Sequence, residues 1–340
     1  MVTGVGGVVV AAAIYLSGAF RGSDEPVPVP ADRTVDAASF VPQSVAFWDV
    51  NHGVAAGTAT CIGTDCEAST VGIVQLTEDS GATWTSVLDT ASGLTRVSVA
   101  STGAAWAITK HGDLWRTADA GETWDAVGMV PRYDGSAELS FASPQLGWAV
   151  VQTSEWELYR TEDGGATWQR IDDPCHGSVP ITEIAVPMGE LVGITDISLA
   201  APDAGWILCS GEGAAGSSPQ AVFSSTDGGT SWTLDWSGFQ VSSAGLQMLS
   251  SGDGVRWDQM GGVAGTTDGG ATWSQARQVD LPEFSGMPLS SVSVVSPTAA
   301  YALIVPIGSH EPAPTLLMSS DDGASWRVVR TFATPSVDPG

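Results

Sequence analysis

Six aspartates occupy the same position of an octapeptide that the chain carries six times. The octapeptide is Ser/Thr-x-Asp-x-Gly-x-Ser/Thr-Trp, and six copies in one chain are far more than chance would give. A row of carboxylates is chemically suited to acid–base catalysis or to calcium binding. Each aspartate, however, belongs to its own separate repeat, so we interpret the six as structural. They are Asp79, Asp119, Asp163, Asp227, Asp268 and Asp321, and the tryptophans that end the copies are Trp84, Trp124, Trp168, Trp232, Trp273 and Trp326.

The residue types of the octapeptide explain why it forms a turn. Its aspartate can accept backbone N–H groups in an Asx-type turn. Its glycine, at the fifth position, supplies the positive φ that a tight hairpin needs. The Ser or Thr then leads into a strand, and we expect the Trp to open that strand and pack between sheets.

A second pattern precedes each octapeptide and supplies the elements that position it. An alternating strand, with the period of two seen in Val97-Ser98-Val99, is followed by a short turn and a second strand. First strands start at Val45, Val97, Leu139, Ile197, Leu246 and Val292, and second strands start nine residues later, at Val54, Trp106, Trp148, Trp206, Val255 and Tyr301. Each repeat therefore has four strands, here called A to D, with the octapeptide between C and D. Four-stranded units repeated radially predict an all-β chain folded as a single β-propeller.

The octapeptide resembles the Asp box, or bacterial neuraminidase repeat, of sialidases, two-propeller xyloglucanases, sortilin-type receptors and photosystem II assembly factors. The repeat from Leu139 to Trp168, with Gly147-Trp148 and its octapeptide, is most similar to the assembly-factor family. The resemblance covers roughly residues 42 to 332 and implies a propeller whose Asp boxes lie away from any active site. Six repeats fit six blades, with seven, the usual number in the assembly factors, as the alternative. We expect residues 34–40 to form only a partial strand near the closure.

The remaining segments and the cysteines indicate an exported protein. Residues 1–22 are apolar and predict a signal peptide or membrane anchor, and residues 23–40 form an acidic, proline-rich linker. The propeller is expected over 41–333, with a tail at 334–340. Four cysteines without a CxxC pair argue against zinc and favour disulfides in an oxidising compartment. Their positions predict the pairs Cys61–Cys66 and Cys175–Cys209, and a secreted or membrane-anchored, extracytoplasmic location.

Charge excludes one class of partner. The formal net charge is −26, with only 12 Lys plus Arg, and such a field repels nucleic acid. No motif indicates a metal, a cofactor or a set of catalytic residues, so none is predicted.

The lengths of the connections point to a functional face. The A–B turns and the octapeptides are constant, and both lie on one face of a propeller, here called the turn face. The B–C and D–A connections lie on the opposite face, here called the loop face. From the start of B to the octapeptide Asp the separations are 25, 13, 15, 21, 13 and 20, and from the Trp to the next A strand they are 13, 15, 29, 14 and 19. Variable loops on a rigid scaffold are where binding usually occurs.

Two groups of residues populate the loop face. The positions just before each A strand should ring the mouth of the central channel: Ser44, Arg96, Glu138, Asp196, Gly245 and Ser291. The loops around them carry Lys110, His111, Arg132, Tyr133, Trp156, His176, Trp257, Arg277 and His310. Aromatic residues and arginine are typical interface anchors.

The favoured function is a non-catalytic binding or assembly propeller with a protein or peptide partner, and a carbohydrate as the alternative ligand. The alternative function is a glycoside hydrolase of sialidase type. In that family, three arginines bind the substrate carboxylate, a Tyr–Glu pair acts as the nucleophile, and a further carboxylate acts as the acid. Arg96, Arg132 and Arg277 could supply the arginines, and Tyr133 with Glu138 or Glu183 the pair. The sialidase Arg-Ile-Pro string is absent, and its nearest counterpart is Arg170-Ile171-Asp172. A xyloglucanase needs two propellers, and this chain has room for one.

Overall fold

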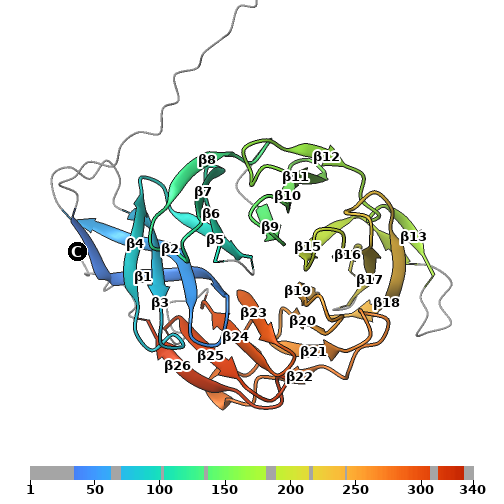
Figure 1. The fold of residues 1–340 in the computed structure, drawn as a ribbon. Coiled ribbons are helices and arrows are strands. Elements are labelled where there is room, and N and C mark those ends of the chain that lie inside the picture. Colours follow the sequence, from blue (N-terminus) through green and yellow to red (C-terminus); the bar gives the residue numbers. More distant parts are fainter. Residues whose placement is uncertain are drawn as a thin grey trace, which may run out of the picture.

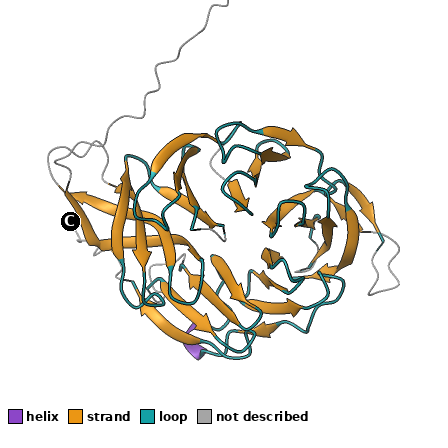
Figure 2. Cartoon of the chain, in the orientation of Figure 1, coloured by secondary structure: helices purple, strands orange, loops and turns teal. Residues whose placement is uncertain are grey.

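The computed structural model consists almost entirely of strands (Figure 2). It describes residues 34–62, 70–100, 103–133, 137–180, 189–213, 217–241, 243–306 and 313–332. Within these ranges the only helical element is one 3-10 turn, Pro282–Phe284. None of their helices is both long and apolar enough to span a bilayer.

Six four-stranded antiparallel sheets are arranged radially around a central axis (Figure 1). The A strands, nearest the axis, are β1 (Thr34–Phe47), β5 (Leu94–Val99), β9 (Ala137–Phe141), β15 (Gly193–Leu199), β19 (Ser243–Met248) and β23 (Ser291–Ser296). The B strands are β2 (Gly53–Ile62), β6 (Ala105–Thr109), β10 (Gly147–Gln152), β16 (Gly205–Ser210), β20 (Gly254–Asp258) and β24 (Ala299–Ile304). The C strands are β3 (Thr70–Thr77), β7 (Asp113–Thr117), β11 (Trp156–Thr161), β17 (Ser218–Ser225), β21 (Gly262–Thr266) and β25 (Thr315–Ser319). The D strands are β4 (Thr85–Thr90), β8 (Asp125–Met129), β12 (Gln169–Ile171), β18 (Thr233–Gln240), β22 (Arg277–Gln278) and β26 (Arg327–Thr331). The fold is therefore a six-bladed β-propeller, as the six repeats predicted.

Side chains of each A strand bind the backbone of the next one and close the ring. Ser44 accepts the N–H of Val97, Ser98 that of Phe141 and Ser140 that of Leu199. In the same way, the Asp196 side chain accepts the N–H of Leu246, and the Gln247 side chain accepts the N–H of Val294. Between the last and first blades, Ser291 accepts the N–H of Val45 at 3.0 Å. The closure thus uses the same kind of bond as every other seam.

The core lies between neighbouring blades, where aromatic rings stack. Phe47 of β1 lies flat on Tyr301 of β24, with ring centroids 3.6 Å apart. Trp106 of β6 and Phe141 of β9 repeat the arrangement at 3.7 Å. Burying such large apolar rings is the main stabilising term at these seams.

The octapeptides form six equivalent turns. In the third blade, Oδ1 of Asp163 accepts the backbone N–H of Thr167 at 2.8 Å, and Oδ2 accepts the Thr167 hydroxyl at 2.6 Å. The glycine at the fifth position has a positive φ in all six copies, as expected. The fourth position also has a positive φ in every copy, including the non-glycine residues Ser80, Ala120 and Asp322, which the sequence did not predict.

The octapeptide tryptophans differ slightly from expectation. We expected each to open a D strand, but each lies just before it, because the turn ends one residue later than the pattern suggested; in the fifth blade β22 starts four residues after Trp273. The rings still pack between blades: Trp84 lies edge-on to Phe47 at 6.1 Å. Trp326 is buried, and the other five are partly buried.

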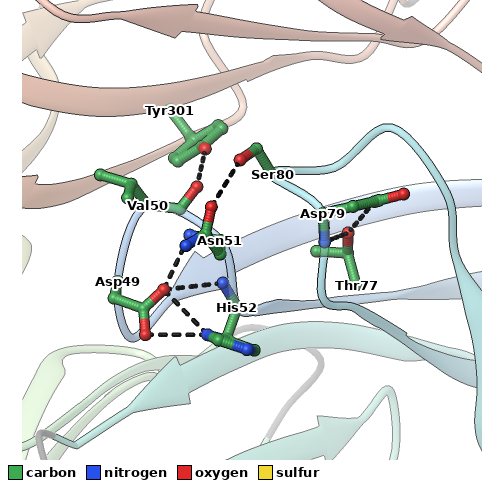
Figure 3. Close-up of polar contacts among 8 residues, drawn as sticks. All are labelled: Asp49, Val50, Asn51, His52, Thr77, Asp79, Ser80 and Tyr301. Atoms are coloured by element: carbon green, nitrogen blue, oxygen red, sulfur yellow. Dashed lines mark hydrogen bonds and ion pairs between the residues drawn. The ribbon is translucent and has the colours of Figure 1, made fainter.

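Each octapeptide is bonded to the A–B turn of its own blade, and Figure 3 shows this region in the first blade. The backbone N–H of Ser80 donates to the carbonyl of Asn51 at 2.9 Å, and the Ser80 hydroxyl donates to the Asn51 side chain at 3.1 Å. The fourth-position N–H makes the equivalent bond in the other five blades, at 2.9–3.1 Å. The hydroxyl of Tyr301, from the last blade, also donates to the carbonyl of Val50. Because both kinds of turn are held by these bonds, neither can change length freely.

The propeller begins earlier in the chain than the expected residue 41. Residues 34–40, placed at the end of the linker, belong to β1, where Phe40 is buried and meets the ring of Phe332 edge-on at 6.0 Å. The apolar segment 1–22 and the tail 334–340 lie outside the described residues.

Candidate functional site

The central channel holds a cavity of about 130 Å³ that all six blades line. Ser44, Arg96, Glu138, Asp196 and Ser291, five of the six positions predicted to ring the channel, line this cavity. The sixth, Gly245, has no side chain, and Trp257 of β20 lines the cavity beside it. A cavity of this volume is large enough for several water molecules or for one small side chain.

Two charged residues pair across the channel wall. The guanidinium of Arg96 in β5 forms an ion pair with the carboxylate of Glu138 in β9, and it also donates to the carbonyl of Ser290 at 3.4 Å. The Arg96 and Glu138 side chains are 26% and 20% exposed. Burial raises the pKa of Glu138, and the charge of Arg96 partly offsets that effect. The pair is therefore close to neutral as a unit.

Asp196 in β15 is the most strongly perturbed acid of the channel. Its Oδ1 accepts the N–H of Ile197 and its Oδ2 that of Leu246, both at 2.8 Å. Burial raises its pKa to about 8, and the nearby charge of Glu138 acts in the same direction. Burial and the neighbouring carboxylate of Glu138 thus disfavour the charged form of Asp196, and the two backbone N–H groups partly offset this effect.

Tyr133 lies at the edge of this group. It is half-buried, and burial raises the pKa of its phenol, while the charge of Arg96 lowers it. Its ring contacts the backbone at Gly112, where an added Cβ would come within 2.8 Å of the Tyr133 side chain. Arg96, Tyr133, Glu138, Asp196 and Trp257 are therefore the predicted residues that the structure brings together.

Trp257 and Trp156 lie in strands, although both were predicted in exposed loops. Trp257 is 7% exposed within β20, because Gly245 leaves room for its indole. Trp156 begins β11 and packs over Gly193, where an added Cβ would lie 2.0 Å from the indole, against the core of blades three and four. Their burial means that truncating Trp156 would disturb packing as well as any contact with a partner.

A second charged cluster lies at the seam between blades two and three, and the sequence did not reveal it. Glu157 in β11 is 4% exposed. Its Oε1 binds Arg132 at 3.0 Å and Arg170 at 3.2 Å, and its Oε2 accepts the hydroxyl of Tyr159 at 2.7 Å. A buried carboxylate needs such partners, and the two arginines and the tyrosine hydroxyl offset the cost of burying Glu157. Only the alternation of Glu157 and Tyr159 on one face of the strand could have hinted at it.

The other predicted residues are dispersed. Lys110 and His111 are exposed in the β6–β7 turn, and His176 is exposed, with its ring 3.6 Å from Asp173. Arg277 was expected in a loop but lies in β22, the outer strand of blade five. His310 and Glu183 lie outside the described residues.

The longest D–A connection is fixed to blade four by a disulfide. Cys175 and Cys209 are bonded, as predicted, with their Cα atoms 5.2 Å apart. Between Cys175 and β15 the chain forms a two-stranded sheet, β13 (Gly177–Val179) with β14 (Gly189–Leu191). Cys61 is also disulfide-bonded, and Cys66, its predicted partner, lies outside the described residues.

Exposed apolar side chains are concentrated on the loop face. Seven large apolar residues of the described chain are more than a third exposed. Five lie on the loop face: Ile62 and Met129 end strands there, and Val192, Val241 and Met260 lie in the connections between strands. The two on the turn-face side are Val50, in the β1–β2 turn, and Val328, near the start of β26.

Comparisons with known proteins support the fold. No family model matches the sequence, and no curated protein matches it. Among solved structures, the α-L-arabinofuranosidase Arb93A from Fusarium graminearum is 12% identical with a TM-score of 0.51, over 84% of this chain and 94% of that one. YCF48 from Cyanidioschyzon merolae is 18% identical with a TM-score of 0.49, over 89% of this chain and 90% of that one. The structure of YCF48 bound to D1 peptide is 17% identical with a TM-score of 0.47, over 88% of this chain and 83% of that one. At 12% identity, the likeness to Arb93A shows a shared fold only.

Proposed function

We propose that this chain is a non-catalytic propeller that binds a protein or peptide partner on its loop face, around the mouth of the channel. The observation that carries the proposal is the placement of five of the seven exposed large apolar side chains on that face. A protein partner bound on that face would bury these side chains and remove their apolar surface from water.

The bonding of the turn face supports the same choice. Its A–B turns and octapeptides are joined to each other within every blade. Indole N–H groups also cross the seams there: Trp106 donates to the carbonyl of Gly164 and Trp206 to that of Gly269, both at 2.8 Å. The turn-face groups are therefore used in bonds within and between blades, and in this proposal the ligand binds the loop face. In this proposal the octapeptides are Asp boxes with a structural role.

The hydrolase alternative requires three arginines around one substrate carboxylate. Arg96 is paired with Glu138 in the channel, and Arg132 is paired with Glu157 at the seam of blades two and three. Arg277 lies in the outer strand of blade five. Since these guanidiniums belong to three different surroundings, binding without catalysis is the better proposal.

We assign the protein to an extracytoplasmic compartment, secreted or anchored through residues 1–22 with 23–40 as the linker. The Cys175–Cys209 disulfide supports this assignment, because such bonds persist in oxidising environments.

Site-specific photo-cross-linking in native cells tests the proposal. A photoreactive amino acid is placed in the full chain at Met129 or Met260 on the loop face, and at Val50 or Val328 as matched controls of similar exposure. We expect one protein adduct shared by the two loop-face positions and missing from the two controls. Adducts confined to the controls would place the partner on the turn face instead, and hydrolysis of a sialoside by the purified chain would favour the hydrolase.

A further inference from the structure

Two arginines at the seam between blades two and three share one buried carboxylate. Arg132 lies in the connection between β8 and β9 on the loop face, and Arg170 lies in β12, so the two come from neighbouring blades. Their Nη1 atoms lie 3.0 and 3.2 Å from the same oxygen of Glu157, Oε1. The other oxygen, Oε2, accepts the hydroxyl of Tyr159. Glu157 therefore holds the two guanidiniums side by side.

The two guanidiniums carry more charge than Glu157 neutralises, since one carboxylate balances only one arginine. The Arg132 and Arg170 side chains are 62% and 56% exposed, whereas that of Glu157 is 5% exposed. Among the described residues, Glu157 is the only partner that either guanidinium bonds. The exposed acids Glu155 and Asp172 lie nearby in the sequence, but neither forms an ion pair with these arginines. A guanidinium carries several N–H donors, so both arginines keep donors that face solvent.

The backbone holds Arg132 in an uncommon conformation. Its φ of 53° lies in the left-handed region, which arginine adopts rarely. The chain on both sides of it is fixed to blade two, because the N–H of Val130 donates to the carbonyl of Gly112 at 3.0 Å and the Tyr133 side chain packs against Gly112. Exposed Lys110 belongs to the same β6–β7 turn as Gly112, so a third cation lies close to the pair.

This part of the loop face is an exception in a strongly acidic chain, whose formal net charge is −26. Five Lys and Arg residues of the described chain are exposed, and three of them, Lys110, Arg132 and Arg170, lie in blades two and three. The other two are Arg277 in β22 and Arg327 in β26. Exposed charges more than about 8 Å apart are largely screened at physiological salt, so the local cations dominate the field that a bound group meets here.

We propose that Arg132 and Arg170 together bind a carboxylate side chain, an Asp or Glu of the peptide partner, and so orient an acidic segment of that partner across this seam. The inference rests on the proposed function, because it names the chemistry of the partner segment that reaches the loop face. A carboxylate has two oxygens, so each arginine can donate to one of them, and the planar guanidinium fits this geometry. Met129, which is 56% exposed at the end of β8, supplies an apolar contact beside the pair.

Charge selects an acidic segment over the alternatives. A neutral segment would cover the two guanidiniums without replacing the water that solvates them, which costs free energy. A basic segment would be repelled by the excess positive charge. An acidic segment would be repelled by most of the remaining surface, so this pair fixes where it binds and in which orientation.

Nuclear magnetic resonance of the arginine side-chain N–H groups tests the proposal on the full chain. The probes are a capped peptide of alternating Gly and Glu, its Gly–Gln counterpart of equal length, and an acetylated oligoglycine with a free C-terminal carboxylate. The signals are assigned by their loss in Arg132→Gln and Arg170→Gln, and we expect only the Gly–Glu peptide to shift both of them saturably. Each variant leaves Glu157 paired with the other arginine, so it should fold and should bind the Gly–Glu peptide about three- to fivefold more weakly.

Arg277→Gln is the matched control, because it removes the same charge from an exposed arginine of blade five and should leave the affinity unchanged. Equal weakening by Arg277→Gln would reduce the effect to net charge and overturn the proposal. An equal response to the Gly–Gln peptide, a stronger one to the oligoglycine, or no response to any probe would also overturn it. Loop-face cross-links without binding of the Gly–Glu peptide would refute this inference alone, whereas cross-links confined to Val50 and Val328 would overturn the proposed function.

Discussion

Oδ2 of Asp196 in blade four accepts the backbone N–H of Leu246 in blade five at 2.8 Å, inside the channel. A serine makes the same inter-blade bond in blades one and six, through Ser44 and Ser291. An aspartate at this place is more costly than a serine, because burial and the nearby Glu138 both disfavour its ionisation. Both carboxylate oxygens of Asp196 accept backbone N–H groups, one within blade four and one from blade five.

This placement predicts how stability depends on pH. The folded-state pKa of Asp196 is raised to about 8 from an ordinary 3.8, so the folded chain holds a proton that the unfolded chain releases. Its contribution is complete below about pH 4 and is lost as the pH rises toward 8. Thermal melts from pH 4 to pH 9 should show a fall in Tm across this window that Asp196→Asn reduces. Equal slopes for both proteins would contradict the raised pKa.

The octapeptide aspartates act in the opposite direction. Hydrogen bonds from the side chain and the backbone of Thr123 lower the pKa of Asp119 to about 2, and Asp227 is lowered to about 2 in the same way by Ser231. Their contribution is present above about pH 4 and is lost as the pH falls toward 2. Tm should therefore drop again below pH 4, and circular dichroism melts between pH 2 and pH 4 would detect it.

Asp163→Ala should destabilise the propeller without direct damage to the loop face. The substitution leaves the N–H and hydroxyl of Thr167 without their acceptor. We expect Tm to fall by roughly 2–4 °C, as for the loss of one or two turn hydrogen bonds. Glu162→Ala, at the exposed neighbour, is the matched control and should leave Tm unchanged. Lost partner binding with an unchanged Tm would contradict the structural role.

The Cys175–Cys209 disulfide should stabilise the fold substantially. The two cysteines are 34 residues apart, and closing a loop of this size contributes about 3–4 kcal/mol in the chain-entropy treatment. The double variant Cys175→Ser/Cys209→Ser should lower the denaturation midpoint accordingly. If the double variant unfolds at the wild-type denaturant concentration, the bond contributes nothing to stability.

Exchanging the charges of the channel pair separates folding from recognition. Arg96→Glu alone leaves three acids together in the ring and should destabilise the fold. The double variant Arg96→Glu/Glu138→Arg restores the pair and should recover most of the stability. Denaturant titration of the single and double variants measures this. If the double variant is no more stable than the single one, the ion pair does not hold the two blades together.

The periodic part of the fold could be predicted from sequence, because its causes are local. The octapeptide specifies its own turn, and alternation specifies the flanking strands, so all six blades follow from the spacing. The positive φ at Ser80 and Ala120 could not be predicted, because these residue types rarely adopt it. The bond from each of them to the A–B turn imposes that conformation.

The site could be predicted only in part, since it depends on contacts between blades. Position alone placed Arg96, Glu138 and Asp196 in one ring. The pairing of Arg132 and Arg170 on Glu157 joins residues from two blades and leaves no mark in the local sequence. Trp257 was assigned to a loop because nothing in its own strand shows that Gly245 makes room for the indole.

The most direct test of the account is the affinity of the cross-linked partner for matched surface variants. Met129→Glu and Met260→Glu place a charge on the loop face, and Val50→Glu and Val328→Glu place the same charge on the turn-face side. All four side chains are exposed, so the variants should fold normally. Calorimetric titration should show binding weakened at least about tenfold by each loop-face change, as expected for an interface residue, and unchanged by the other two. Weakening by Val50→Glu and Val328→Glu alone would contradict the assignment of the loop face.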